Sequence, residues 1–101
     1  MRKETDIQRE ICKYLKIKGY FFWRESNQRR FKNGVHLKTW YEIKGKPDIL
    51  ILHKGMFIGV ECKSEVGILS PNQKEFRRMW ERNGGMYIVA KSVNDVIEAG
   101  L

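Results

Sequence analysis

The alternation of hydrophobic and polar residues predicts a helix at the start of the chain. Four apolar residues recur there at helical spacing: Ile7, Ile11, Tyr14 and Leu15. This pattern predicts an amphipathic helix over residues 5–18. Thr5 and Gln8 have the spacing of a capping box at its first turn, and Gly19 is the residue type that commonly follows a helix.

Strands are predicted where apolar residues form short runs between turn residues. The runs cover residues 20–23, 49–52, 56–60 and 86–90. Lys54-Gly55 separates the second run from the third, which predicts a hairpin with a two-residue turn.

A second helix is predicted to begin after Ser70. An N-cap serine, Pro71 at the first helical position and Gln73 as the partner in a capping box form a strong start signal. Three residues provide the inner stripe of this helix: Phe76, Met79 and Trp80. Glycines 84–85 end it, and Ser92 begins a short terminal helix.

The predicted order of elements is α-β-β-β-α-β-α. A helix joins the strand that ends near Lys63 to the strand at 86–90, and such a connection implies a parallel pair with a right-handed crossover. We therefore expect the α/β class, with a mixed sheet flanked by helices. A chain of 101 residues accommodates one domain, which we assign to residues 1–101.

Composition narrows the functional classes. No apolar run approaches the ~20 residues of a membrane span, and the first residues have no apolar signal segment. Cys12 and Cys62 are too few for a disulfide framework or a zinc site. We expect a reduced cytoplasmic protein with no membrane partner.

The net charge of +8 indicates a polyanionic partner, of which nucleic acid is the commonest. Residues 24–46 hold seven cations and two acids, a net +5 in a stretch that is either a long loop or a ragged hairpin. The residues that we expect to contact DNA are Arg24, Arg29, Arg30, Lys32, Lys44 and Lys46. A solvated basic surface is the alternative.

The predicted hairpin brings two acidic residues together. With a two-residue turn at 54–55, the numbers of cross-strand partners sum to 109, so Asp48 faces Glu61. Such partners share a face of the sheet, with Cβ atoms ~4.5–5.5 Å apart. Lys63 lies two residues beyond Glu61 and projects from the same face.

Two carboxylates placed in this way repel each other, and a divalent cation would remove the conflict. Oxygen ligands suit Mg²⁺ or Mn²⁺, so we expect Asp48, Glu61 and the backbone carbonyl of Cys62 to bind one of them. The cation would polarise a phosphodiester, while Lys63 activates water or offsets charge in the transition state. Alternatively, Glu-x-Lys is an ordinary solvated strand segment and Asp48 is a turn residue after Pro47.

The same residues resemble a known signature. Gly-Lys-Pro-Asp at 45–48 and, after twelve intervening residues, Glu-Cys-Lys at 61–63 resemble the PD-(D/E)xK nuclease motif. More narrowly, residues 4–96 resemble the VRR-NUC family of virus-type replication-repair nucleases. Further shared features are Glu4, Gln8, Gly19, Trp23-Arg24, Leu69-Ser70 and Gln73. Cys62 replaces the valine of many members, which changes only a side chain expected to be buried.

The resemblance implies a restriction-endonuclease-like core, dependence on Mg²⁺ or Mn²⁺ and cleavage of structured DNA. A protein of this kind is expected to be bacterial or phage-encoded. Glu4 shares a helix face with Gln8, which makes it a candidate metal ligand or, alternatively, a solvated acid near the helix dipole. Gln73 is placed in the catalytic set, although it can also serve only as the cap partner of Ser70.

Three functions stay open. The first is an endonuclease at four-way (Holliday) junctions, the second a nuclease of the same fold for flaps, nicked or linear duplex DNA, and the third a non-catalytic DNA-binding module. The complete set of Asp48, Glu61 and Lys63 favours a nuclease. Stand-alone members of the family resemble homodimeric junction resolvases, and aromatic residues typical of interfaces lead us to expect a homodimer. They are Phe21, Phe22, Trp23, Phe31, Trp40 and Tyr41.

Overall fold

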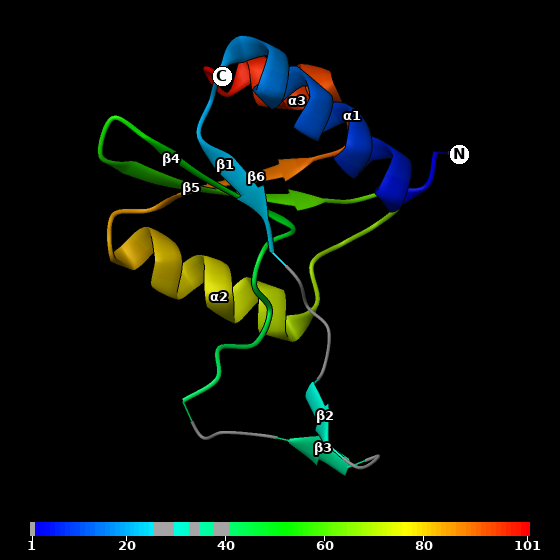
Figure 1. Cartoon of the computed structure of the whole chain (residues 1–101), viewed down its shortest axis with the longest axis vertical. Coiled ribbons are helices and arrows are strands. Elements are labelled where there is room, and N and C mark those ends of the chain that lie inside the picture. The colour runs from blue at the N-terminus through cyan, green and yellow to red at the C-terminus, as the bar shows by residue number, and fades with distance from the viewer. Residues whose placement is uncertain (1, 26–29, 33–34, 38–40) are drawn as a thin grey trace.

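The computed structural model describes residues 2–25, 30–32, 35–37 and 41–101. Within these ranges, three helices and a four-stranded sheet form the main body, and two short strands form a separate hairpin (Figure 1). The elements are α1 (Glu4–Lys18), β1 (Phe22–Arg24), β2 (Arg30–Lys32), β3 (Val35–Leu37), β4 (Ile49–His53), β5 (Met56–Cys62), α2 (Pro71–Arg82), β6 (Met86–Ala90) and α3 (Val93–Glu98). None of the described helices is long and apolar enough to cross a membrane.

The sheet is mixed, as predicted, with strand order β1-β4-β5-β6. β4 pairs antiparallel with both β1 and β5, whereas β6 runs parallel to β5. Because parallel neighbours cannot be joined by a tight turn, α2 carries the chain from β5 across to β6. The predicted parallel pair and α/β class are therefore confirmed.

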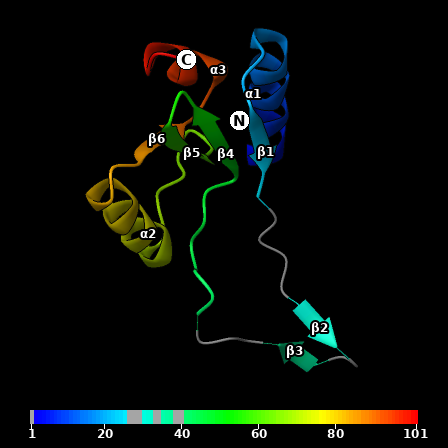
Figure 2. The same ribbon diagram turned by 60° about the vertical axis from the view of Figure 1, so that its left-hand side comes forward.

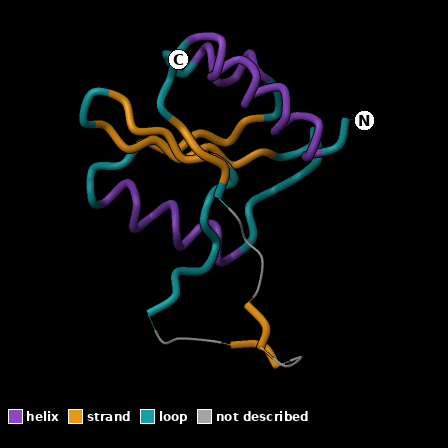
Figure 3. The backbone as a smooth tube through the Cα atoms, in the orientation of Figure 1, coloured by secondary structure: helices purple, strands orange, loops and turns teal. Residues whose placement is uncertain are grey.

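The helices lie on both faces of the sheet. Figures 1 and 3 show α1 and α3 on one side of the strands and α2 on the other, and Figure 2 shows the same layers from another direction. The core under α1 and α3 consists of apolar residues with little exposed surface: Ile7, Ile11, Leu15, Ile49, Ile51, Ile58, Val60, Cys62, Ile88, Ala90 and Val96. Burial of each large aliphatic side chain contributes ~1.5–3 kcal/mol to this packing.

The first helix begins earlier than the sequence predicted, and the predicted capping box is wrong. Its N-cap is Lys3, which makes no side-chain capping bond, so Thr5 already lies inside the helix. Glu4 and Asp6 place negative charge in the first turn, where the helix dipole favours it. Gly19 ends the helix in the left-handed region with φ 83°, as expected.

The second helix begins as predicted. Ser70 Oγ accepts a hydrogen bond from Gln73 N, and Gln73 Oε1 accepts one from Ser70 N. Trp80 faces inward, where its Nε1 donates to Met86 O at 2.9 Å. Met79, which was predicted on the inner stripe, is instead 41% exposed, so the buried side of α2 is narrower than its sequence suggests.

The basic stretch contains a ragged hairpin rather than a plain loop. Arg30 pairs with Leu37 and Lys32 with Val35 across β2 and β3. Figure 2 shows this hairpin extending away from the four-stranded sheet. The second of the two forms left open by the sequence is thus the one observed.

The chain that leads into β4 is held between α2 and β5. Gly45 has φ 75°, and a Cβ there would lie 2.3 Å from Asn72 O at the first turn of α2. Pro47 is fully buried, and its Cγ would lie 2.9 Å from a Cβ added to Gly59. These close approaches fix the backbone on which Asp48 sits, and only glycine allows the first of them.

Candidate active site

The register of the β4–β5 hairpin is the predicted one. Ile49 faces Val60 at the end of the ladder, and residues 54–55 form the turn. Both turn residues have positive φ, as a type I′ turn requires. Asp48 directly precedes β4 and Glu61 directly follows Val60, so the two acids lie together at the open end of the hairpin.

Asp48 is fixed by the neighbouring strand. Its Oδ2 accepts a hydrogen bond from the backbone nitrogen of Cys62 at 2.8 Å. This bond continues the contact between the strands one residue beyond the last ladder pair. The side chain of Asp48 therefore keeps one orientation next to Glu61.

Glu61 is an almost fully buried acid, with 3% of its surface exposed. Its Oε1 has no hydrogen-bond partner among the described residues. Burial first, and then the charge of Asp48 and a hydrogen bond with it, raise the pKa of Glu61 from its ordinary 4.5 to about 8. The positive charge of Lys63 acts in the opposite direction. A buried carboxyl group with a strongly shifted pKa in a polar cluster is typical of a functional site.

Lys63 projects to the same side and is buried as well. Its Nζ lies 3.9 Å from Glu61 Oε2, a distance at which the two charges attract without a close hydrogen bond. Its backbone nitrogen donates to Ala90 O at 3.0 Å, which ties the residue to β6. The three residues predicted from the hairpin register are thus brought together by the fold.

Cys62 serves the site through its backbone. Its thiol lies in the core, 1% exposed, and burial raises its pKa. Its N–H points toward Asp48, and in a strand the N–H and C=O of one residue face the same neighbour. The Cys62 carbonyl therefore also points toward the side on which Asp48 lies, as a backbone ligand would have to.

The oxygen atoms of these residues fit Mg²⁺ or Mn²⁺, with the protein supplying only some of the ligands. Among residues 2–25, 30–32, 35–37 and 41–101, no three His, Cys, Asp or Glu side chains are close enough together to hold a metal by themselves. Mg²⁺ does not require that, because it usually keeps several waters and binds one or two carboxylates together with substrate phosphates. The unpartnered Glu61 Oε1 beside Asp48 is the kind of buried oxygen that such an ion would satisfy.

Glu4 reaches the edge of this site from α1. Its Oε2 accepts a hydrogen bond from Ser64 N at 3.4 Å, just after Lys63. Its charge also contributes to raising the pKa of Glu61, after the larger effects of burial and Asp48. The residue is exposed and also lies in the first turn of α1, so its carboxylate is next to both the site and the helix N-terminus. Its assignment as a metal ligand remains a prediction.

Gln73 is occupied by its structural role. Its side-chain oxygen binds Ser70 N at 2.9 Å, so this atom completes the capping box. The residue is half-buried. Its catalytic assignment remains a prediction.

The predicted DNA contacts lie in different environments. Lys44 is exposed, and Arg24 is exposed at the end of the edge strand β1. Lys46 forms an ion pair with Glu25 at 3.1 Å, so its charge is partly neutralised. Arg29 lies outside the described residues, and for Arg30 and Lys32 only the strand backbone is described.

Two residues near the site were not singled out from the sequence. Glu25 accepts from Trp23 Nε1 as well as from Lys46, a link that charge counting cannot reveal. Tyr87 pairs with Gly59 in β6, on the face that carries Glu61, and its hydroxyl is buried without a partner among the described residues. Burial first and the charge of Glu61 second raise the pKa of Tyr87. Tyr87 could have been placed near Glu61 only from the register of the parallel pair β5–β6, which the sequence does not fix.

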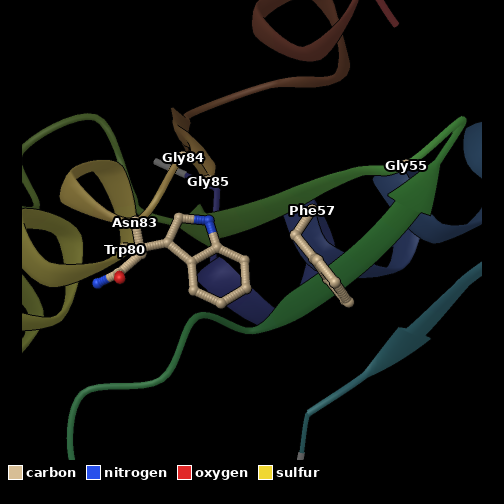
Figure 4. A pocket seen from close by; sticks show the side chains of 6 residues that line it. All are labelled: Gly55, Phe57, Trp80, Asn83, Gly84 and Gly85. Carbon is tan, nitrogen blue, oxygen red and sulfur yellow. The ribbon is translucent and has the colours of Figure 1, made fainter.

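A hollow of about 280 Å³ lies at the other end of the hairpin. Figure 4 shows the rings of Phe57 and Trp80 on its wall, with centroids 5.9 Å apart. Its lining consists of Gly55, Phe57, Trp80, Asn83, Gly84 and Gly85. None of these is an acid or a base, unlike the residues at the carboxylate end of the hairpin.

Comparisons with known proteins identify the fold. No protein-family model matches the chain, and no curated protein matches its sequence. A solved structure described as a VRR_NUC domain is similar over 100% of both chains, with a TM-score of 0.71 and 22% sequence identity. At this identity the likeness shows a shared fold. The resemblance inferred from the sequence is confirmed at that level.

Proposed function

We propose that a chain with this fold and this carboxylate pair is a metal-dependent, structure-selective DNA endonuclease that hydrolyses phosphodiester bonds at four-way (Holliday) junctions. One observation carries the proposal: buried Glu61 lies beside Asp48 and Lys63 at the open end of the β4–β5 hairpin. Support comes from the fold shared with a VRR_NUC domain.

The residues of the chain have distinct roles in this proposal. Asp48, Glu61 and the Cys62 carbonyl would hold Mg²⁺ or Mn²⁺, with Glu4 as a further ligand. Such a cation would supply Lewis acidity at the phosphodiester and would offset negative charge on the leaving oxygen. Lys63 orients the attacking water or offsets charge in the transition state.

The charge of the chain supports DNA as the partner. Its net charge is +8, and +5 of this lies in residues 24–46, next to the segment that carries Asp48. Such a distribution favours a phosphate backbone through release of counterions, without reading the base sequence. Selectivity must then come from the shape of the DNA.

A symmetric homodimer is part of the proposal. One metal site nicks one strand, and resolution of a junction needs two nicks at symmetry-related positions. Phe21, just before the edge strand β1, and Trp23 within it support this assembly, because they are 67% and 39% exposed, with rings 6.0 Å apart. Exposed aromatic residues on one surface are typical of interfaces.

Cleavage of a four-way junction beside a linear duplex of matched sequence tests the proposal, first in Mg²⁺, then in Mn²⁺ and finally in EDTA. We expect paired nicks in the junction, slower cleavage of the duplex and no cleavage in EDTA. Preference for flaps, nicked or linear duplex DNA would select a nuclease with another substrate. Tight DNA binding without cleavage in either metal would select a non-catalytic binding module.

A further inference from the structure

The segment between β5 and α2 starts directly after Lys63 and carries two exposed aliphatic side chains. Val66 is 71% exposed and Ile68 is 81% exposed. Single exposed aliphatic residues are common on protein surfaces and call for no explanation. Two of them on either side of one glycine, next to the buried lysine of the proposed active site, call for an explanation.

The backbone of this loop is anchored at several points. Ser64 N donates to Glu4 Oε2, Gly67 N donates to Ser64 O at 3.0 Å, and Lys91 Nζ donates to Glu65 O at 2.8 Å. At its end the capping box of α2 holds Ser70. The loop thus presents its two aliphatic side chains from a fixed backbone.

Gly67 brings the loop against the proposed active site. A Cβ at this position would lie 3.2 Å from Lys63 Cβ and 3.3 Å from Glu4 Oε2. Val66 and Ile68 are its immediate neighbours in the chain. A phosphate at the carboxylate pair would therefore bring the adjoining nucleotides close to these two side chains.

We propose that Val66 and Ile68 form an apolar wedge that contacts base faces next to the scissile phosphate, at a point where the DNA stack is interrupted. This inference rests on the proposed function. The faces of the bases are the apolar part of DNA, and aliphatic side chains are known to insert between base steps. Unstacking costs least at a branch or nick, so the wedge would favour branched over continuous duplex DNA.

The charges of the loop between β5 and α2 are compatible with a DNA partner. Its acidic residue is Glu65, and the ammonium group of Lys91 donates a hydrogen bond to the backbone carbonyl of Glu65, so a positive charge lies beside the loop as well. The wedge provides shape selectivity without contacts that read the base sequence. A chain that binds the phosphate backbone through its net positive charge needs such a source of selectivity.

The test compares Val66→Ser/Ile68→Ser with Ile17→Ser. Ile17 is a similarly exposed isoleucine, 83% exposed, at the C-terminal end of α1, whereas Glu4 lies at the N-terminal end. Each protein is titrated in EDTA, so that no strand is cut, against a four-way junction and a linear duplex. Both DNAs carry 2-aminopurine at the same sequence position, next to the branch in the junction.

We expect the wild type and Ile17→Ser to increase 2-aminopurine fluorescence in the junction and to bind it about tenfold more tightly than the duplex. The double variant should bind both DNAs with equal affinity and leave the fluorescence unchanged. Ile68→Leu, which keeps an apolar side chain, should retain the wild-type response. An unchanged preference and fluorescence in the double variant would overturn the wedge.

Light scattering on the same samples tests whether Val66 and Ile68 contact a second copy of the chain instead of DNA. Loss of self-association in the double variant, but not in Ile17→Ser, would make the loop an interface between copies of the chain and would also overturn the wedge. If the wild type binds no DNA, the proposed function itself fails. If the wild type binds DNA in EDTA without any change in fluorescence, yet cuts it once Mg²⁺ is added, only the wedge fails.

Discussion

Asp48 Oδ2 accepts a hydrogen bond from the backbone nitrogen of Cys62 at 2.8 Å, which joins the start of one strand to the end of its neighbour. The bond holds the Asp48 carboxylate beside Glu61 through the backbone, independently of any ion. An asparagine could keep this bond through its amide oxygen while lacking the negative charge. The site can therefore be neutralised without loss of its geometry.

Asp48→Asn and Glu61→Gln are each expected to lower the cleavage rate at least ~10²-fold, because each removes charge from the proposed metal site. DNA binding should persist, since the basic stretch is untouched. Single-turnover cleavage and DNA titrations measure the two effects. As a control, Asp48→Ala should melt at a lower temperature than Asp48→Asn, because alanine also removes the bond to Cys62. Full activity in Asp48→Asn would contradict the metal site.

The stability of the metal-free protein should fall as pH rises. The pKa of Glu61 is raised to about 8 in the folded chain, so its stabilising contribution is complete below about pH 4.5 and is lost as pH increases through about 8. Thermal unfolding in EDTA from about pH 5 to about pH 9 measures this trend, with Glu61→Gln as the reference that lacks the titrating group. Added Mg²⁺ or Mn²⁺ should restore stability at high pH, because it binds the ionised form. Parallel curves for the two proteins would refute the assignment.

Lys63→Ala should lower the chemical step by ~10²-fold or more, the usual scale for loss of an acid–base or charge-stabilising group. Its affinity for the metal should change little, because Lys63 is not among the proposed metal ligands. Rapid-quench kinetics at saturating DNA and metal give the rate. Lys74→Ala, an exposed lysine on α2, is the matched control. Equal rates in the two variants would exclude the proposed role.

Replacement of Arg29 and Arg30 with alanine should weaken DNA binding and reduce its salt dependence. Each phosphate contact that is lost lowers the slope of log K against log salt by ~0.9. Titrations at several salt concentrations determine this slope. Arg78→Ala is a suitable control, because Arg78 forms an exposed ion pair with Glu75 on the outer side of α2. A slope equal to that of the wild type would place the two arginines away from DNA.

The free protein should sediment at about twice its 12.0 kDa mass at micromolar concentration, because two-fold dimers are the commonest assemblies. Phe21→Ser with Trp23→Ser should shift it toward the monomer, whereas Ile17→Ser should not. Sedimentation equilibrium without DNA measures both. A monomeric wild type that still makes paired cuts would show that dimerisation is unnecessary for resolution.

The site was largely predictable because a two-residue turn fixes the alignment of both strands. Once residues 54–55 were assigned to the turn, the pairing of Ile49 with Val60 followed, and with it the neighbourhood of Asp48 and Glu61. The direction of Glu4 was not predictable in this way, since it depends on how α1 packs across the sheet.

Other differences have similar physical causes. The ion pair between Lys46 and Glu25 joins residues on two separate segments, and net charge contains no information about such pairing. The capping box at Thr5 failed because the acidic first turn lets α1 begin at Glu4 without a side-chain cap. Phe21 and Trp23 are exposed as the dimer prediction required, but Phe22 packs against the core. The side chain of Phe31 and all of Trp40 lie outside the described residues.

The alternation of side chains along β5 limits how the length of this strand can change. Side chains alternate between the two faces of a strand, so one residue added or removed within β5 would turn Glu61 toward α1. An insertion would bring Val60 to the side of Asp48, and a deletion would bring Cys62 there. Many substitutions at exposed positions of β4 and β5 would preserve the site, whereas a single-codon insertion or deletion between Met56 and Glu61 would disrupt it.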